Sequence, residues 1–342
     1  MLVYVENEVK NNSQFLKFQQ KFKNIDIIYI DNYKNIFDKK FPNWKKEKAI
    51  IFAKLRWNCL TQAPEDYGHE KFSYFLKNSL NCIFDCRYCF LKWAFINDFQ
   101  VYFVNYDDMK KEISQALKKY KNQQEKIPDQ VRDDKQNKEF KVNNAKLRFY
   151  SSDYSDNLWM NWFSNFVQEF IPFFEKLDGA MLEIRTKSIN IQPLLDLWFV
   201  PKNTEIAFSL NPHQLIEKYE KWVASLDDRI QAVNILIDKW FKVWLRFLPL
   251  LPVQNYQQIY LEFIDYIKQK IPMNKVSSTF ASWLLYTKAD YLNILKKDPY
   301  FDLMYLLEEN EDGFVREKKE IRDWFYEQFR ELDKKCMICL DS

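Results

Sequence analysis

The chain has 342 residues, a net charge of +3 and 47% hydrophobic residues. This length and composition allow one large α/β domain with small extensions, or two domains, and a sizeable core. The charge argues neither for nor against a nucleic-acid partner, and the three glycines of the chain are too few for a glycine-rich phosphate loop.

The N-terminal segment predicts a cytoplasmic protein. Acidic residues occur in the first ten positions, where a signal peptide would need an apolar run. No uncharged apolar stretch reaches about eighteen residues, so no membrane span is expected. The six cysteines do not form the pattern of a secreted disulfide framework, and reduced thiols favour the cytoplasm.

Residues 1–70 are predicted to form a small α/β extension. Strands are expected at Leu2–Val5, Ile25–Ile30 and Ala49–Leu55, and a helix at Asn12–Lys23, where phenylalanines recur at helical spacing. The lysine-rich segment Asn32–Lys48 is predicted to be mostly loop.

A cysteine-rich loop follows a strand predicted at Phe72–Leu80. It places Cys82, Cys86 and Cys89 at the spacing C-x3-C-x2-C. Three thiolates on one loop can hold three corners of a [4Fe–4S] cluster and leave one iron open. S-adenosylmethionine (SAM) can chelate that iron, and reduction then releases a 5′-deoxyadenosyl radical. Zinc is an alternative, although it usually takes four ligands in two pairs and no second pair lies nearby. Chance clustering of buried cysteines is another.

Strands and helices then alternate about six times, which is typical of parallel β/α units. Further strands are predicted at 99–104, 147–151, 180–186, 205–210, 243–248 and within 275–285. Helices are predicted at 91–95, 107–120, 158–175, 192–197, 226–240 and 256–270. Residues 121–146 are polar and predict a flexible insertion. The alternative is a basic segment that binds nucleic acid. The expected organisation is a barrel over 71–285 and a mainly helical region with a tail over 286–342.

Polar residues lie where several predicted strands end, which is where barrel enzymes place their chemistry. Lys187 is suited to the carboxylate of SAM, although a surface lysine after a strand is the alternative. Asp153 and Asn211 are candidates for its amino group or ribose.

An ordered set of motifs resembles spore photoproduct lyase and its relatives in the radical SAM superfamily. The resemblance covers about residues 2–270 and rests on these segments: Leu2–Glu6, the cysteine loop with Tyr88 and Phe90-Leu91, Glu183–Ser188, Phe208–Pro212, Tyr219-Glu220, Ala224–Ala232 and Trp244–Pro249.

The resemblance implies a partial (β/α)6 TIM-like radical SAM barrel with one [4Fe–4S] cluster and SAM. In that family the adenosyl radical takes a hydrogen from a thymine-dimer lesion of DNA, and a cysteine returns a hydrogen after the dimer fragments. The three loop cysteines match the cluster ligands. Ser152, Lys187 and Ser209 match SAM-contacting positions, and Tyr88 matches a tyrosine of the cluster loop.

The sequence departs from the family at three places. Tyr150 occupies the position of the hydrogen-donating cysteine, and Phe90 replaces a second tyrosine. The basic, glycine-containing hairpin near the family's C-terminus has no clear match, and Phe301–Lys335 holds eleven acidic against seven basic residues. The tail pair Cys336 and Cys339 is a candidate redox, hydrogen-donor or metal site, but a frayed, inert C-terminus is the preferred prediction.

These observations predict a lyase-type radical SAM enzyme that repairs a DNA thymine-dimer lesion or acts on a related substrate. Its reductant would be of the flavodoxin or ferredoxin type. One alternative is a radical SAM enzyme with a non-DNA substrate and a different radical quench. A non-enzymatic iron–sulfur or zinc protein is another, against which the set Ser152, Lys187 and Ser209 argues.

Overall fold

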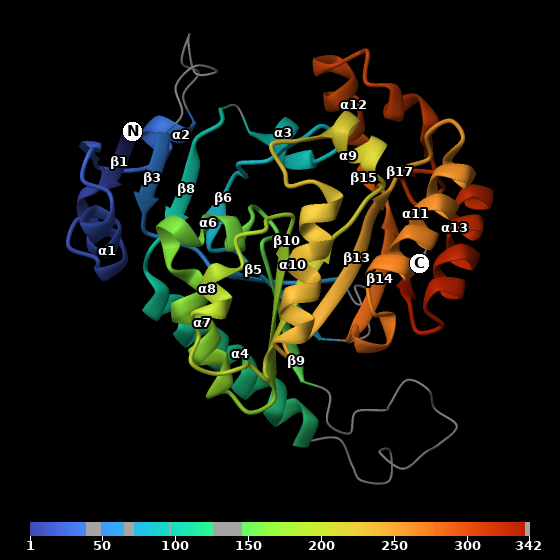
Figure 1. Cartoon of the computed structure of the whole chain (residues 1–342). Coiled ribbons are helices and arrows are strands. Elements are labelled where there is room, and N and C mark those ends of the chain that lie inside the picture. Colours follow the sequence, from blue (N-terminus) through green and yellow to red (C-terminus); the bar gives the residue numbers. More distant parts are fainter. Residues whose placement is uncertain (39–48, 65–71, 96, 126–145, 339–342) are drawn as a thin grey trace.

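The computed structural model describes residues 1–38, 49–64, 72–95, 97–125 and 146–338. Two large sheets organise it: an N-terminal sheet of order β2-β1-β3-β8-β6 and a curled barrel sheet of order β18-β14-β13-β11-β10-β9-β5-β4. In Figure 1 the N-terminal sheet, in blue and cyan, lies at one side of the barrel sheet. Residues 39–48 and 126–145, which carry much of the predicted loop and insertion, lie outside the described residues. No helix within the described ranges is long and apolar enough to cross a membrane.

The N-terminal sheet buries one face under helix α1. Its strands are β1 (Leu2–Glu6), β2 (Asp26–Ile30), β3 (Ala49–Ala53), β6 (Ser79–Leu80) and β8 (Gln100–Phe103). Helix α1 (Ser13–Lys21) begins where the Asn12 side chain accepts a hydrogen bond from the backbone N–H of Gln14 at 2.8 Å. The rings of Phe15 and Phe18 then lie 5.3 and 4.7 Å from that of Phe52. A short helix α2 (Lys34–Phe37) forms where mostly loop was predicted.

The barrel sheet contains six neighbouring parallel strands, which confirms the partial (β/α)6 barrel. They are β5 (Ser73–Leu76), β9 (Leu147–Ser151), β10 (Ala180–Thr186), β11 (Thr204–Ser209), β13 (Val243–Leu250) and β14 (Ser278–Trp283). Strand β4 (Leu60–Gln62) is antiparallel at one edge, and β18 (Met337–Ile338) is parallel at the other.

The strand predicted at Phe72–Leu80 is wrong as a single element. The chain forms β5, which pairs with β9 of the barrel, and then β6, which pairs antiparallel with β8 of the N-terminal sheet. The side chain of Asn78, between them, exchanges two hydrogen bonds with Asn157, at 2.8 and 3.0 Å. Strand β8, predicted as part of the barrel region, therefore belongs to the other sheet.

Helices pack on the outer face of the barrel sheet and enclose the main core. They are α4 (Tyr106–Glu125), α6 (Asn157–Ser164), α7 (Phe166–Glu175), α8 (Gln192–Leu195), α10 (Leu226–Asp238) and α11 (Tyr256–Lys270). Two short helices, α3 (Phe90–Ala94) and α9 (His213–Tyr219), lie instead at one end of the barrel, at the top of Figure 1. Side chains alternate along each strand. In β9, Phe149 faces the helices, with its ring 5.4 Å from that of Phe174, while Tyr150 faces the barrel interior.

The helix predicted at Leu158–Glu175 is two helices, because the backbone of Asn165 is left-handed with φ 51°. Asn tolerates this conformation better than most residues. The start of α7 is stabilised locally: the Asn161 side chain accepts from the backbone N–H of Val167 at 2.8 Å. The apolar periodicity predicts helix on both sides of Asn165, but it does not predict the break at this residue. Helix α4 likewise continues over Lys121–Glu125, which was assigned to the insertion.

The C-terminal region is mainly helical, as predicted, and contains α12 (Lys288–Lys297) and α13 (Lys319–Leu332). Three short strands, β15 (Tyr286–Thr287), β16 (Glu308–Glu309) and β17 (Phe314–Arg316), add a small antiparallel sheet. Three 3-10 turns complete the elements named here: Asn7–Val9, Met273–Lys275 and Asp302–Leu306.

A hairpin containing Gly313, at φ 80°, joins β16 to β17. Its side chains include four acidic residues, Glu308, Glu309, Glu311 and Asp312. The tail is not frayed up to residue 338, because β18 pairs with β14 and Cys336 is buried. Cys339 lies outside the described residues.

Candidate active site at the mouth of the barrel

The cysteine loop is fixed at its start by Asn81. The Asn81 backbone is left-handed, with φ 69°, and its side-chain amide donates to the carbonyls of Asn97 and Phe99 at 2.8 and 3.2 Å. Its side-chain oxygen accepts from the backbone N–H of Cys82 at 3.0 Å. The direction in which the loop leaves β6 is therefore determined by one buried side chain.

The middle of the loop is held by the barrel. Strand β7 (Asp85–Cys86) pairs antiparallel with β12 (Glu220–Lys221). The C-terminal region adds two contacts: the Tyr286 hydroxyl donates to the carbonyl of Tyr88 at 2.5 Å, and Arg87 pairs with Asp298 at 2.8 Å. The loop is thus enclosed by three parts of the chain.

The three thiols of the loop share one electrostatic environment. Burial raises the pKa of Cys82, Cys86 and Cys89, and in each case the Lys187 ammonium acts in the opposite direction. All three are free thiols. Three thiols beside one cation are a donor set that fits a [4Fe–4S] cluster with one open iron. Within the described part of the chain, no three His, Cys, Asp or Glu side chains are placed to hold a single metal ion.

Glu220 is a buried carboxylate that joins the loop to two barrel elements. It accepts from the Tyr88 hydroxyl, from Asn211 Nδ2 at 2.9 Å and from Arg229 Nη2 at 2.7 Å. Burial alone would raise the pKa of Glu220, but the Arg229 and Lys187 cations and these hydrogen bonds bring it below its usual range. An ionised Glu220 holds Tyr88 and Asn211 in fixed positions.

The orientation of the Asn211 amide follows from this contact. An ionised carboxylate can only accept, so Asn211 must turn its NH2 group toward Glu220 and its oxygen away. That Oδ1 atom is buried and has no hydrogen-bond partner. Arg229 also donates to the carbonyl of Ser209 at 2.9 Å. The end of β11 therefore presents a rigid acceptor at the mouth.

A second buried carboxylate, Asp156, positions the ends of β9 and β10. It caps α6 by accepting from the backbone N–H of Trp159 at 2.9 Å, and it accepts from the backbone N–H of Lys187 at 2.8 Å. Ser152 has a left-handed backbone, with φ 72°, and its hydroxyl oxygen accepts from the N–H of Asn157 at 3.0 Å. Burial raises the pKa of Asp153, and the cations of Arg185 and Lys77 oppose the shift.

The barrel interior below the mouth holds Tyr150 among charged side chains. The Glu183 carboxylate accepts from Arg246 Nη2 at 2.6 Å and Arg185 Nε at 2.8 Å, and lies 3.6 Å from Arg148 Nη1. Burial opposes ionisation of Glu183, but these cations bring its pKa to about 2. The Arg185 guanidinium lies 4.4 Å from the centre of the Tyr150 ring, and burial raises the Tyr150 pKa to about 12.

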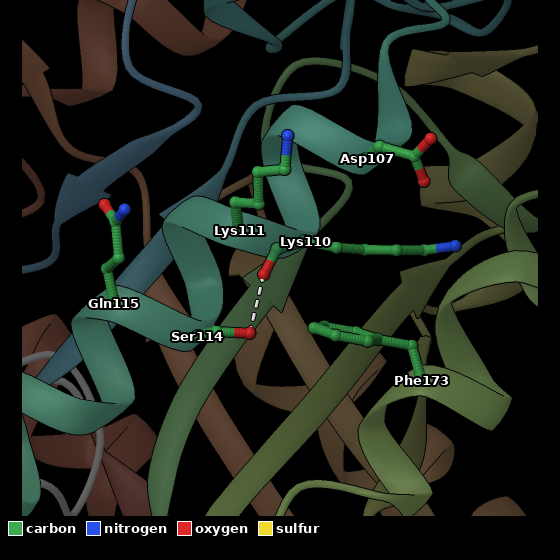
Figure 2. A pocket seen from close by; sticks show the side chains of 6 residues that line it. All are labelled: Asp107, Lys110, Lys111, Ser114, Gln115 and Phe173. Carbon is green, nitrogen blue, oxygen red and sulfur yellow. Dashed lines mark hydrogen bonds between the residues drawn. The ribbon is translucent and has the colours of Figure 1, made fainter.

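A surface hollow of about 610 Å³ lies elsewhere, between α4 and α7. Figure 2 shows its lining, with the Ser114 hydroxyl donating to the carbonyl of Lys110 at 2.8 Å. The hollow is on the outer face of the barrel, and none of its lining residues belongs to the predicted site.

The structure groups most of the predicted site residues at one end of the barrel. Lys187 acts on the loop thiols, and its ammonium is 5.9 Å from the centre of the Tyr88 ring. Asn211 and Ser209 join this group through Glu220 and Arg229, whereas Tyr150 lies deeper. The sequence alone predicts no role for Glu220, Arg229, Asp156 or Glu183, although Glu220 lies in one of the family motifs. Only Asp156 could have been predicted from the local sequence, because it lies three residues before Trp159, where an N-cap residue is expected.

Comparisons with known proteins agree with this arrangement. The family model described as spore photoproduct lyase matches residues 3–326. A spore photoproduct lyase of Clostridium acetobutylicum is 25% identical over 123 residues, which is 36% of this chain and 36% of that relative. The alignment therefore spans about a third of the curated relative.

Two solved structures resemble the whole chain. A spore photoproduct lyase complexed with dinucleoside spore photoproduct has a TM-score of 0.78 at 17% identity, over 100% of this chain and 98% of that chain. A double mutant with bound AdoMet and dinucleoside spore photoproduct has a TM-score of 0.77 at 15% identity, with the same coverage. At these identities the likeness concerns the fold.

Proposed function

The chain belongs to the spore photoproduct lyase family, and from this membership we propose that it is a lyase-type radical SAM enzyme that repairs a DNA thymine-dimer lesion or a closely related one. The observation that carries the proposal is the grouping of three free thiols around the Lys187 ammonium at the barrel mouth. The family fold without these thiols and this ammonium would not indicate which reaction the protein catalyses.

The cofactors can be assigned to residues. When bound, a [4Fe–4S] cluster and SAM supply a 5′-deoxyadenosyl radical. Cys82, Cys86 and Cys89 hold the cluster in this proposal. Lys187 pairs with the SAM carboxylate, a charge-assisted contact that fixes the cofactor's orientation.

The remaining mouth residues complete the SAM site. The unpartnered Oδ1 of Asn211 accepts from a donor, which on SAM is the amino group or a ribose hydroxyl. The Ser152 hydroxyl oxygen already accepts one hydrogen bond and still has its proton to donate. Asp153 follows β9 and Ser209 ends β11, with β10 between these two strands, and both residues are assigned supporting contacts.

Two tyrosines receive different roles. Tyr88 is bound to Glu220 through its hydroxyl, so we assign it to holding the cluster loop in place. Tyr150 stands where the family has its hydrogen-donating cysteine. Because burial raises its pKa to about 12, it keeps its O–H at neutral pH and has a hydrogen atom to give to a product radical.

The substrate is assigned by relationship. The related structures hold dinucleoside spore photoproduct, so a thymine-dimer lesion of DNA is the proposed substrate, and a flavodoxin- or ferredoxin-type protein the proposed reductant. Tyr150 and the acidic hairpin at residues 308–312 favour the second candidate, a radical SAM enzyme with a non-DNA substrate and another quench.

Anaerobic reconstitution of the protein tests the proposal. The native protein should bind about four iron and four sulfide, and Cys82→Ala, Cys86→Ala and Cys89→Ala should each lose the cluster. Cys59→Ala is the matched control, because Cys59 is a buried free thiol of the main core that lies outside the loop. A full cluster in all three loop variants, or stoichiometric zinc in the native protein, would refute the assignment.

Incubation with SAM and dithionite, with and without lesion-containing DNA, tests the substrate. Formation of 5′-deoxyadenosine with no change in the DNA would favour the second candidate.

A further inference from the structure

Arg246 has hydrogen-bonding capacity that the chain does not use. Its side chain is 2% exposed, and one nitrogen, Nη2, donates to Glu183. Its Nε and Nη1 atoms are buried and have no hydrogen-bond partner. Buried donors of a charged group are rarely left unmatched, because each lost hydrogen bond destabilises the fold.

Arg246 lies in the interior of the barrel, where its guanidinium contacts Glu183. In the sheet register Arg246 is opposite Ser209, the last residue of β11, so it lies close to the mouth. Phe75 pairs with Tyr150 across β5 and β9, and Arg185 stacks on the same tyrosine. Phe75 and Arg185 face the interior, yet both are partly exposed. Their exposure therefore comes from space within the barrel.

Three arginines and their carboxylates surround this space. The guanidinium groups of Arg148, Arg185 and Arg246 face Glu183 and Glu205, and the Asp153 carboxylate also acts on Arg185. The net charge therefore gives no preference for an anion, and any such preference comes from the Nε and Nη1 donors of Arg246. A guanidinium with unused donors in a partly desolvated space is suited to a phosphate or a carboxylate.

We propose that the barrel interior next to Arg246 binds an oxyanion of the substrate. The inference rests on the proposed function, since it places the substrate in the same barrel. Two sources have this chemistry: the phosphate that bridges the two nucleosides of a DNA lesion, and a phosphate or carboxylate on a smaller molecule. In either case the oxyanion accepts hydrogen bonds from Arg246 Nε or Nη1 and orients the substrate toward the mouth.

The test compares two forms of spore photoproduct, a dinucleotide with the bridging phosphate and a dinucleoside without it. Their dissociation constants are measured by calorimetry on the reconstituted protein with saturating SAM. The native protein should bind the dinucleotide about tenfold to a hundredfold more tightly, as expected for charge-assisted hydrogen bonds. In Arg246→Gln the two dissociation constants should become nearly equal. If that variant does not fold, the same comparison is made with Arg246→Lys.

Arg148→Gln is the matched control. Arg148 is also a buried barrel arginine, but it already pairs with Glu205 and lies 4.7 Å from the centre of the Trp244 ring. A general defect in folding lowers the affinity for both forms, so the ratio separates binding from stability.

The guanidinium carbon of Arg246 lies 6.0, 5.8 and 4.4 Å from the centres of the Tyr150, Trp244 and Phe280 rings. An equal ratio in the native protein and Arg246→Gln would overturn the proposal and show that these rings alone surround the unused donors.

If neither form binds, the assignment of a thymine lesion fails, but the oxyanion site can still be judged. Inorganic phosphate is then the probe. It should raise the melting temperature of the native protein more than that of Arg246→Gln. Equal shifts in both proteins would reject the oxyanion site itself.

Discussion

Lys187 is the residue that connects the cluster loop with the proposed SAM site. Its ammonium acts on all three loop thiols, and its backbone is held by Asp156. Lys187→Ala should weaken SAM binding by about 1.5–3 kcal/mol, because a charge-assisted hydrogen bond is lost. Calorimetry on the reconstituted protein measures this.

Lys242→Ala is the control for that variant. Lys242 precedes β13, at the end of the barrel away from the mouth, and its ammonium donates to the carbonyl of Lys202 at 2.7 Å. It should leave SAM affinity unchanged. Equal SAM affinity in the native protein and Lys187→Ala would remove Lys187 from the site.

Tyr150 decides how a product radical would be quenched. A thiol gives up hydrogen more readily than a phenol, so repair of thymine lesions by the native protein should be slow or absent although 5′-deoxyadenosine forms. Tyr150→Cys should raise the repair yield and lower stability by about 2–4 kcal/mol, because the ring contacts with Phe75 and Arg185 are lost. Chromatography of digested, lesion-containing DNA measures repair.

Tyr150→Phe keeps the ring and removes the hydroxyl. Efficient repair by the native protein that persists in Tyr150→Phe would show that the donor lies elsewhere, and Cys59, Cys336 and Cys339 would then be the thiols to test.

The residues of the site differed in how well sequence could predict them. The cysteines were found because their spacing within one loop is itself the signal. The partner of Tyr88 is 132 residues away in the chain, and no local pattern links it to Glu220. The same holds for two of the three cations of Glu183: Arg185 is two residues away on β10, but Arg148 and Arg246 come from β9 and β13.

At the scale of the elements, β18 shows that the chain's end is part of the barrel. Met337 packs with Ala207, Trp244 and Phe280 inside the sheet. Deleting residues 335–342 should therefore destabilise the fold by about 2–5 kcal/mol, the usual range for loss of a buried methionine side chain. Thermal unfolding measures this. The control is a deletion of residues 339–342 alone, which removes the last four residues and keeps β18. An unchanged melting temperature after deletion of residues 335–342 would contradict the packing role of Met337.

Helices and strands were predicted within a few residues where periodicity is local, as at Leu147–Ser151 and Ala180–Thr186. The pairing of strands into sheets could not be predicted in the same way. Nothing in the local sequence of β6 and β8 indicates their partners, and only the complete fold shows that they join the N-terminal sheet. The break at Asn165 was missed because a left-handed residue does not interrupt the apolar pattern around it.

For the whole molecule, Glu183 links stability to pH. Its pKa is about 2 in the folded chain, against an ordinary value of 4.5. A carboxyl with a lowered pKa stabilises the fold fully above its ordinary pKa, and this contribution is lost as the pH falls from 4.5 toward 2. Glu183→Gln should lower stability at pH 7 by about 3–5 kcal/mol, since it leaves buried cations without their partner.

Denaturant unfolding of the native protein and Glu183→Gln across this pH range checks the linkage. The difference between the two proteins should be largest at neutral pH and shrink in acid. A difference that does not change with pH would mean that Glu183 contributes through packing alone.

The strands that flank the cysteine loop have a consequence for the order of folding. Strands β6 and β8 belong to the N-terminal sheet, while the middle of the loop pairs with Glu220, more than a hundred residues later. The loop cannot reach its final shape until both sheets exist and have met, and closure over such a separation is slow. Iron loading into the finished site would therefore come late, after most of the chain has been made. A chain that begins at the barrel would lack the strands β1, β2 and β3 on which β8 is built, and its loop would lose the support at its start.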